Sequence, residues 1–176
     1  MHRAHLSWHR ISTAEIALCI RCNRVSRRPA LRAAFAAASR LGDGVAWYAV
    51  IGALPLIYGT AALPVALRMA AAGLCGVLIY KWLKNKTLRP RPYQLAPAIE
   101  AASAPLDQYS FPSGDTLHAV CFTTIATAYY PELGPGLVPF ALLVAASRPV
   151  LGLHYPSDVL AGAGLGFLIA RMALCL

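Results

Sequence analysis

Residues 44–67 read GVAWYAVIGALPLIYGTAALPVAL and contain no charged side chain. A bilayer core about 30 Å thick is crossed by about 20 apolar residues of helix, so this stretch is long enough to span a membrane. A second apolar stretch follows at 65–80, with Arg68 near its start and Lys81 just beyond its end. Three more lie further along the chain, at 116–130, 137–147 and 159–176. The sequence therefore predicts an all-α fold, a polytopic transmembrane helical bundle of about five spans.

The composition indicates an integral membrane protein with a single transmembrane domain. Of the 176 residues, 58% are hydrophobic and only 13% are charged, which is too apolar for an ordinary soluble domain of this size. The formal net charge of +9 suits nucleic acid, anionic lipid or an anionic substrate. Because most of the chain is patterned for lipid, we expect the membrane bilayer as a partner and no nucleic acid.

Residues 1–43 are predicted to form a basic amphipathic segment ahead of a transmembrane domain at 44–176. The first forty residues hold eight arginines and one acid, Glu15. The run Ser-Thr-Ala-Glu at 12–15 matches a capping box that would open a short helix. Pro29 suits the first turn of a second helix. The apolar face of that helix would consist of Leu31, Phe35, Ala38 and Leu41. Such a helix can lie at an anionic membrane interface or pack on the domain, and both arrangements stay open.

Polar residues able to do chemistry gather at the ends of the predicted spans. Residues 84–92 follow the second span, and residues 112–115 precede the third. Arg148 ends the fourth span, and His154 with Asp158 precedes the fifth. Because successive spans run in opposite directions, all of these positions fall on one face of the bilayer. Counting the spans therefore predicts a single site built from three distant parts of the chain.

The side chains expected at this face suit a phosphate group. Arginine binds phosphate oxygens in a bidentate way, and lysine adds a compact positive charge. The cations at this face are Lys84, Arg89, Arg91 and Arg148. Ser113 and Gly114 stand where a helix would begin, so that free backbone N–H groups there can bind an anion. The rival interpretation is a divalent metal, which the neighbouring cations disfavour. Its ligands would be Asp115, His118, His154 and Asp158.

His154 and Asp158 are four residues apart. On a helix, or on the turn that leads into one, this spacing places the carboxylate against the imidazole. Such a carboxylate fixes the tautomer and makes the other ring nitrogen a better nucleophile. Taken alone, a pair of this kind is more often structural than catalytic. Beside an anion site on the same membrane face, it predicts a nucleophilic histidine.

Together these residues resemble the three-part signature of the type 2 phosphatidic acid phosphatase family. The match consists of Lys84-x6-Arg91-Pro92, then Pro112-Ser113-Gly114-Asp115, then Ser147-Arg148-x5-His154-x3-Asp158. The family includes bacterial lipid phosphate phosphatases, and its membrane-embedded members are metal-independent helical bundles. The resemblance therefore implies a membrane lipid phosphate phosphatase that uses neither a metal nor another cofactor.

Carried over position by position, the resemblance implies a role for each matched residue. The phosphate would be bound by Lys84, Arg91, Ser113, Gly114 and Arg148. His154 would attack phosphorus and form a phosphohistidine, with Asp158 orienting its ring. Water would then release inorganic phosphate.

The second motif departs from the family at Asp115, where a histidine otherwise acts as general acid on the leaving oxygen. Substrate phosphate and burial favour a protonated Asp115, whereas the nearby lysine and arginines favour its ionised form. Losing a general acid typically costs about 10²–10⁴-fold in rate. With Asp115 as the third catalytic residue, we expect an enzyme that is weakened or shifted towards lower pH.

A phosphate site at a bilayer face suits an amphiphile whose head enters the site while its tail stays in lipid. Phosphatidic acid, phosphatidylglycerophosphate, and isoprenoid phosphates or diphosphates all fit, and the loop at 93–111 is expected to act as a lid or lateral gate. The arginine-rich N-terminal segment favours an inner-membrane protein with its site on the cytoplasmic face. Two alternatives stay open: a phosphotransferase that uses the same phosphohistidine, and a catalytically silent membrane protein that binds lipid phosphate.

Overall fold

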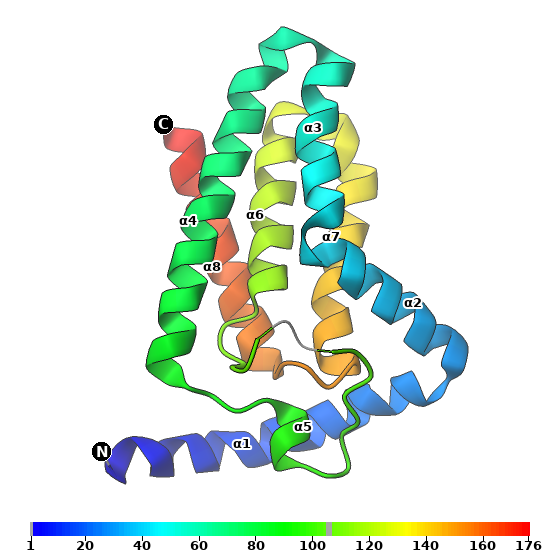
Figure 1. The fold of residues 1–176 in the computed structure, drawn as a ribbon, viewed down its shortest axis with the longest axis vertical. Coiled ribbons are helices and arrows are strands. Elements are labelled where there is room, and N and C mark those ends of the chain that lie inside the picture. The colour runs from blue at the N-terminus through cyan, green and yellow to red at the C-terminus, as the bar shows by residue number, and fades with distance from the viewer. Residues whose placement is uncertain (1, 105–106) are drawn as a thin grey trace.

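The chain folds into an all-helical bundle that stands on a long N-terminal helix (Figure 1). The structure is a computed structural model that describes residues 2–104 and 107–176, with side chains from Thr13 onward. Residue 1 of the predicted basic segment and residues 105–106 of the predicted loop lie outside the described residues. No strand occurs within the described ranges, which confirms the predicted all-α class.

Five long helices form the bundle, and α6 lies at its centre against α4, α7 and α8. The five are α3 (Ala46–Tyr58), α4 (Leu63–Thr87), α6 (Gly114–Tyr129), α7 (Gly134–Val150) and α8 (Pro156–Cys175). By length and composition, four helical segments of the described residues can cross a membrane, namely Pro29–Tyr58, Thr60–Leu95, Pro131–Val150 and Pro156–Cys175. The shorter α6, which the others surround, is the fifth helix, in agreement with about five predicted spans.

The first two spans differ in their boundaries from the prediction. The apolar stretch 44–67 does not form one helix, because α3 ends at Tyr58 and the chain turns through η3 (Thr60–Ala62). Gly59 begins this turn with a φ of 75°, a conformation that glycine adopts at little cost. Helix α4 then continues past the predicted end of its span to Thr87. Lys84 therefore lies on the last turn of a helix and not on a loop.

The N-terminal segment also folds differently from the prediction at one point. Helix α1 (His2–Asn23) runs through residues 12–15 without a break, so the predicted helix start at Ser12 is wrong. Glu15 makes long-range contacts instead of capping a helix, as described below. Pro29 does begin α2 (Pro29–Arg40), which follows η1 (Arg24–Arg27).

Helix α2 is held against the bundle by one part of its predicted apolar face. Ala38 is buried, whereas Leu31 and Leu41 are 38% and 47% exposed. The chain continues from α2 through a single π-helical turn, η2 (Leu41–Val45), into α3. The proposed boundary between residues 43 and 44 falls inside this turn.

Two glycines of α8 bring the start of α6 close to α8. A Cβ atom on Gly162 would collide with the carbonyl oxygen of Ser113, and one on Gly166 would collide with that of Leu117. Small residues at such crossings let two helix backbones approach closely in a membrane. Ser113 N also donates a hydrogen bond of 3.1 Å to the carbonyl oxygen of Asp158. The first turns of α6 and α8 are thereby fixed to each other.

The chain segments that carry the predicted site meet at one end of the bundle, next to α1 (Figure 1). The end of α4, the start of α6, the end of α7 and the start of α8 all lie there. The short helix α5 (Pro92–Leu95) and the loop after it cover this end. At the opposite end, η4 (Pro131–Leu133) links α6 to α7.

Candidate active site

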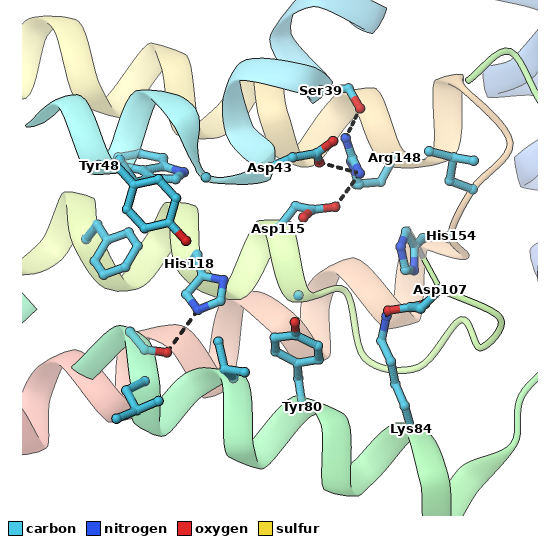
Figure 2. Close-up of a pocket in the computed structure, with 18 of the residues that line it drawn as sticks. Ser39, Asp43, Tyr48, Tyr80, Lys84, Asp107, Asp115, His118, Arg148 and His154 are labelled. Carbon is cyan, nitrogen blue, oxygen red and sulfur yellow. Dashed lines mark hydrogen bonds and ion pairs between the residues drawn. The ribbon is translucent and has the colours of Figure 1, made fainter. Parts of the chain in front are cut away.

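A cavity of about 550 Å³ opens among α3, α4, α6 and α7 at the end of the bundle near α1 (Figure 2). One part of its wall is polar and charged. Of the predicted site residues, it is lined by Lys84, Arg91, Gly114, Asp115, Arg148 and His154. These residues come from three separate parts of the chain, 84–91, 114–115 and 148–154. Ser113 and Asp158 lie behind the wall and do not line the cavity.

His154 is buried, with 2% of its surface exposed, and turns one ring nitrogen towards the cavity. Its Nδ1 lies 2.7 Å from the carbonyl oxygen of Ser110, which can only accept a hydrogen bond, so Nδ1 carries the proton. Its Nε2 lies 3.3 Å from Arg91 Nη1, which can only donate. The Nε2 lone pair of the neutral ring is therefore the one that faces the cavity.

The surroundings of His154 favour this neutral form. Burial lowers the pKa of the imidazole, and the positive charges of Arg91 and Arg148 lower it further. The carboxylate of Asp158 acts in the opposite direction. A nitrogen that stays unprotonated at neutral pH can act as a nucleophile.

Asp158 lies beside His154, as the spacing predicts, but the geometry is less direct. Its Oδ2 is 3.7 Å from His154 Nδ1, farther than the carbonyl oxygen of Ser110. The same Oδ2 accepts hydrogen bonds from Ser110 Oγ and from Tyr155 N. Asp158 thus fixes Ser110, whose carbonyl group binds the imidazole. It also fixes the turn that carries His154.

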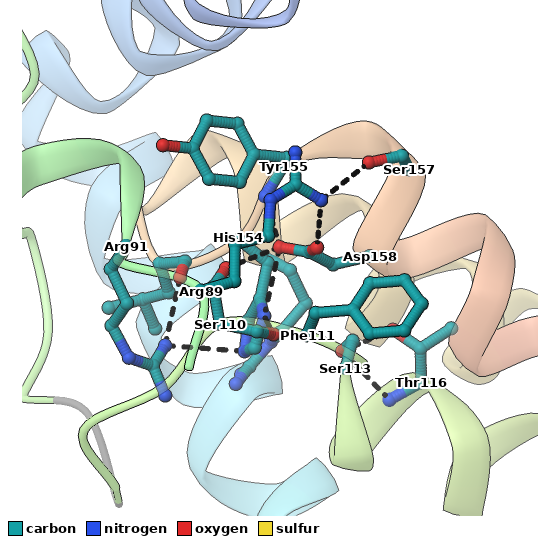
Figure 3. Close-up of polar contacts among 12 residues, drawn as sticks. Arg89, Arg91, Ser110, Phe111, Ser113, Thr116, His154, Tyr155, Ser157 and Asp158 are labelled. Carbon is teal, nitrogen blue, oxygen red and sulfur yellow. Dashed lines mark hydrogen bonds and ion pairs between the residues drawn. The ribbon is translucent and has the colours of Figure 1, made fainter. Parts of the chain in front are cut away.

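Arg89 does not line the cavity and instead binds Asp158 (Figure 3). Its Nη1 donates to Asp158 Oδ1 at 2.5 Å and to Ser157 Oγ at 2.8 Å. Its Nη2 lies 2.5 Å from Glu15 Oε2, and Glu15 Oε1 accepts from Ser157 N at 3.1 Å. From the sequence, Arg89 was expected among the cations at the phosphate site. In the structure it joins α1 to the start of α8.

Lys84 and Arg91 both bind the carboxylate of Asp107, a loop residue that the sequence analysis did not single out. Lys84 Nζ lies 2.5 Å from Asp107 Oδ2, and Arg91 Nη2 lies 2.7 Å from Asp107 Oδ1. Burial raises the pKa of Asp107, but the two cations outweigh it and hold the pKa below its usual value. Asp107 is therefore ionised at neutral pH and occupies the space between two predicted phosphate ligands.

Arg148 binds two carboxylates and two hydroxyl groups. Its Nη1 pairs with Asp115 Oδ2 and lies 3.6 Å from Asp43 Oδ1. Its Nη2 donates to Ser39 Oγ, and its Nε donates to Ser147 Oγ at 3.2 Å. Ser39 belongs to α2 and Asp43 to η2, so the N-terminal segment contributes side chains to the cavity. Neither residue was predicted from the sequence.

The start of α6 has the geometry expected of an anion-binding helix N-terminus. Ser113 is the N-cap, and its Oγ accepts a hydrogen bond from Thr116 N. This cap uses the Ser113 hydroxyl group for the helix itself. The backbone of Gly114, which begins α6 and lines the cavity, is the part of the motif that faces a ligand.

The rest of the cavity is apolar and extends between α3 and α4. Its wall there is formed by Trp47, Tyr48, Ile51, Gly52, Leu74 and Val77. Tyr48 is 76% exposed and Leu74 is 63% exposed, so the cavity reaches the outer surface of the bundle. His118 also lines it, with Nε2 bound to the carbonyl oxygen of Gly73 at 3.1 Å. Among the described residues, no three His, Cys, Asp or Glu side chains are placed to hold a metal ion.

The three matched motifs and the geometry around His154 have a counterpart among known proteins. A family model described as the PAP2 superfamily matches residues 61–176. The chain belongs to the PAP2 superfamily. The PAP2 match includes every residue predicted for the site. Glu15, Ser39 and Asp43 precede it, and so are outside the part of the chain that the family model describes.

Two PAP2 relatives carry the name phosphatidylglycerophosphatase B. The protein from Bacillus subtilis is 33% identical over 103 residues, which cover 52% of this chain and 48% of the relative. The protein from Haemophilus influenzae is 37% identical over 71 residues, which cover 35% of this chain and 30% of the relative. The alignments thus span about half or less of the length of these relatives.

Two solved structures share the PAP2 fold with this chain. A transmembrane PAP2 type phosphatidylglycerolphosphate phosphatase from Bacillus subtilis superposes with a TM-score of 0.77 at 24% identity, covering 94% of this chain and 85% of the other. LpxE of Aquifex aeolicus superposes with a TM-score of 0.74 at 25% identity, covering 91% of this chain and 94% of the other. The similarity to the first of these confirms the transmembrane helical bundle.

Proposed function

We propose that this PAP2 protein is a membrane phosphatase that removes phosphate from a lipid through a phosphohistidine on His154. The observation that carries the proposal is that His154, whose unprotonated Nε2 accepts a hydrogen bond from Arg91, shares one cavity with Lys84, Arg91 and Arg148. A nucleophile surrounded by cations suits a phosphoryl group, whose transfer depends on positioning and on stabilised negative charge. The names of the relatives support a lipid phosphate as the substrate.

In the first step, Nε2 of His154 attacks phosphorus from the side opposite the lipid oxygen. The N–P bond forms while the P–O bond to the lipid breaks, and the electron pair of that bond goes to the leaving oxygen. Lys84, Arg91 and Arg148 bind the phosphoryl oxygens, assisted by the backbone N–H of Gly114. The leaving oxygen takes up a proton and departs as the lipid alcohol, or as the shorter phosphate if the substrate is a diphosphate.

In the second step, water attacks the phosphohistidine. The O–P bond forms, the N–P bond breaks, and its electron pair returns to Nε2 of His154. The water loses one proton to the group that protonated the leaving oxygen, and its hydroxyl group stays on phosphorus. Ser110 and Asp158 act as positioning residues in both steps, because the Ser110 carbonyl and the nearby carboxylate stabilise the positive charge that the imidazole acquires. The chain's own cations supply the charge that a metal ion provides in other phosphatases.

The substrate tail would occupy the apolar part of the cavity between α3 and α4. This part reaches the exposed side chains of Tyr48 and Leu74, which would face lipid in a membrane. A lipid could therefore place its head among the cations while its chains remain in the bilayer. We accordingly propose the gap between α3 and α4, and not the loop at 93–111, as the entrance for the tail.

We propose an inner-membrane location with the site on the cytoplasmic face. Helix α1 and the arginine-rich turn after it lie at the same end of the bundle as the cavity (Figure 1). Basic segments are retained in the cytoplasm, so the site would face the same compartment. In a variant without native cysteines, a membrane-impermeant thiol reagent should label Gln94→Cys only after the membrane is opened. It should label Thr60→Cys, at the other end, in intact cells.

The direct test is a phosphate-release assay with purified protein on phosphatidic acid, phosphatidylglycerophosphate and an isoprenoid diphosphate. We expect release from at least one of them and none from His154→Asn, with Arg171→Gln on the exposed side of α8 as the control. Asp115→His restores the family residue, and we expect it to raise the rate by at least about tenfold at neutral pH. Substrate binding without release in both the chain and Asp115→His would indicate a silent binder. Phosphate found on an added alcohol instead of in solution would indicate a phosphotransferase.

A further inference from the structure

The missing histidine of the second motif leaves open which group protonates the leaving oxygen. The proposed reaction produces a lipid alkoxide, which is a poor leaving group without a proton. Asp115 stands at the family position but is ion-paired with Arg148. A lone carboxylate held by an arginine has no proton to give.

Asp115 is not alone, because Asp43 lies against the same guanidinium. Both carboxylates approach Nη1 of Arg148, and both line the cavity that contains His154. One nitrogen, Nη1 of Arg148, thus pairs with an oxygen of each carboxyl group, Oδ2 of Asp115 and Oδ1 of Asp43, the latter at 3.6 Å. Two ionised carboxylates at one site repel each other, so this arrangement favours a state in which one of the two carries a proton.

We propose that Asp43 and Asp115 form a carboxyl pair that holds one proton and acts as the general acid in place of the family histidine. The inference rests on the proposed phosphatase function. One arginine offsets one negative charge, so a second ionised carboxylate in the same place is unfavourable. Two carboxyl groups that share a site in this way can hold one proton between them.

The local fold explains how Asp43 reaches the cavity. It lies in the π-helical turn η2, where Gly44 has a φ of 134° and breaks the regular helix between α2 and α3. Trp47 Nε1 donates a hydrogen bond of 3.1 Å to the carbonyl oxygen of Gly42, which fixes the turn. Turns of this kind are often found at functional sites.

The pair also lies on the side of the cavity that the reaction requires. Figure 2 shows Asp43 and Asp115 between His154 and Tyr48, that is, between the nucleophile and the apolar part of the cavity. In-line displacement puts the leaving oxygen on the side of phosphorus away from His154. The lipid tail is attached to that oxygen, so a tail between α3 and α4 places the oxygen near the pair.

The proton balance is complete without a further reactant. In the first step the pair transfers its proton to the leaving oxygen as the P–O bond breaks, and two carboxylates remain at Arg148. In the second step the attacking water gives a proton back to the pair, and the hydroxyl group stays on phosphorus. The pair returns to its starting state after each turnover.

The test compares two substrates that differ in their need for a proton. Phosphatidic acid releases an alcohol oxygen, whereas p-nitrophenyl phosphate releases a stabilised phenolate. We expect Asp43→Asn and Asp115→Asn each to lower phosphatidic acid hydrolysis by about 10²-fold or more and p-nitrophenyl phosphate hydrolysis by less than about tenfold. The double variant should be no worse than the single ones, because the two groups act as one acid.

Ser39→Ala is the matched control, since Ser39 also binds Arg148 but holds no acidic proton. It should lower both rates by the same factor. Both rates are measured on one preparation of each variant, so partial misfolding cancels in their ratio. If Asp43→Asn does not fold, Asp43→Ser gives the same comparison. A wild-type ratio of the two rates in the Asp43 variants would overturn the pair while leaving the phosphatase function intact. Absence of phosphate release by the unaltered chain would overturn both.

Discussion

The Nδ1 atom of His154 lies 2.7 Å from the carbonyl oxygen of Ser110, a residue that precedes it by 44 positions. This contact sets the tautomer of the imidazole and turns Nε2 towards the cavity. Oδ2 of Asp158, the expected partner of His154, lies 3.7 Å from Nδ1 and accepts a hydrogen bond from Ser110 Oγ. The orientation of the proposed nucleophile is therefore determined by the loop before α6 together with the start of α8.

The first prediction concerns the pH dependence of catalysis. Burial and the neighbouring arginines lower the pKa of His154 below its ordinary value of 6.5. The nucleophile must be neutral, so on the acidic side activity is lost as the pH falls through this lowered pKa. We expect the acidic limb of kcat/KM, which reports the free enzyme, to have its midpoint below 6.5. A midpoint above that value would contradict the assigned environment of His154.

The second prediction concerns Glu15, which acts on His154 only through Arg89 and Asp158. Glu15→Gln removes the charge that holds Arg89 and so loosens the support of Asp158. We expect kcat to fall by about tenfold, because one hydrogen bond to a charged group contributes ~1.5 kcal/mol. KM should be unchanged, because the residue does not reach the cavity.

Glu132→Gln is the control for Glu15, since Glu132 is an acid at the opposite end of the bundle that binds Tyr58. It should change neither constant. If Glu15→Gln raised KM and left kcat intact, the link from α1 to the nucleophile would be refuted.

The third prediction concerns Asp107, which binds Lys84 and Arg91 in the space proposed for phosphate. An incoming phosphate has to displace this carboxylate from both cations. Asp107→Asn should lower the inhibition constant of inorganic phosphate by about tenfold, or ~1.4 kcal/mol. Glu100→Gln makes the same charge change on an exposed residue of the same loop and should have no effect. An equal inhibition constant in wild type and Asp107→Asn would show that phosphate binds elsewhere.

The fourth prediction tests the place of the lipid tail. Gly52 lines the cavity on α3, and a Cβ atom there would meet nothing within 4 Å. Gly52→Leu should fill the apolar part of the cavity and lower hydrolysis of long-chain phosphatidic acid by about tenfold. This factor corresponds to an energetic cost of ~1–2 kcal/mol for forcing the lipid tail into a space that is already filled. Hydrolysis of p-nitrophenyl phosphate should not change.

Gly164→Leu adds the same side chain at an open position on α8 outside the cavity. It should affect neither substrate. An equal loss on both substrates in Gly52→Leu would place the tail outside the gap between α3 and α4.

The sequence was sufficient to predict the helical bundle and to group the main polar residues at one end of it. Apolar length determines the number of spans, and alternating span direction determines which ends lie together. Lys84, Arg91, Arg148 and His154 could be grouped for this reason. The boundaries were less predictable, since the break at Gly59 lies in an uninterrupted apolar stretch.

The other parts of the site could not be predicted because they depend on contacts without a sequence pattern. The Ser110 carbonyl is a backbone group, which every residue type carries. Asp107 lies in an irregular loop, and Asp43 reaches Arg148 only because of the turn at η2. Glu15 was assigned to a helix cap on the basis of local spacing, whereas its partners lie more than seventy residues away.

The proposed mechanism requires that His154 becomes covalently attached to phosphorus. Rapid quenching of the protein with ³²P-labelled lipid phosphate, followed by peptide mapping, measures this directly. We predict label on the peptide that contains His154 during turnover, with neither label nor phosphate release in His154→Asn. Phosphate release at the wild-type rate by His154→Asn, or turnover without any labelled His154, would contradict the account.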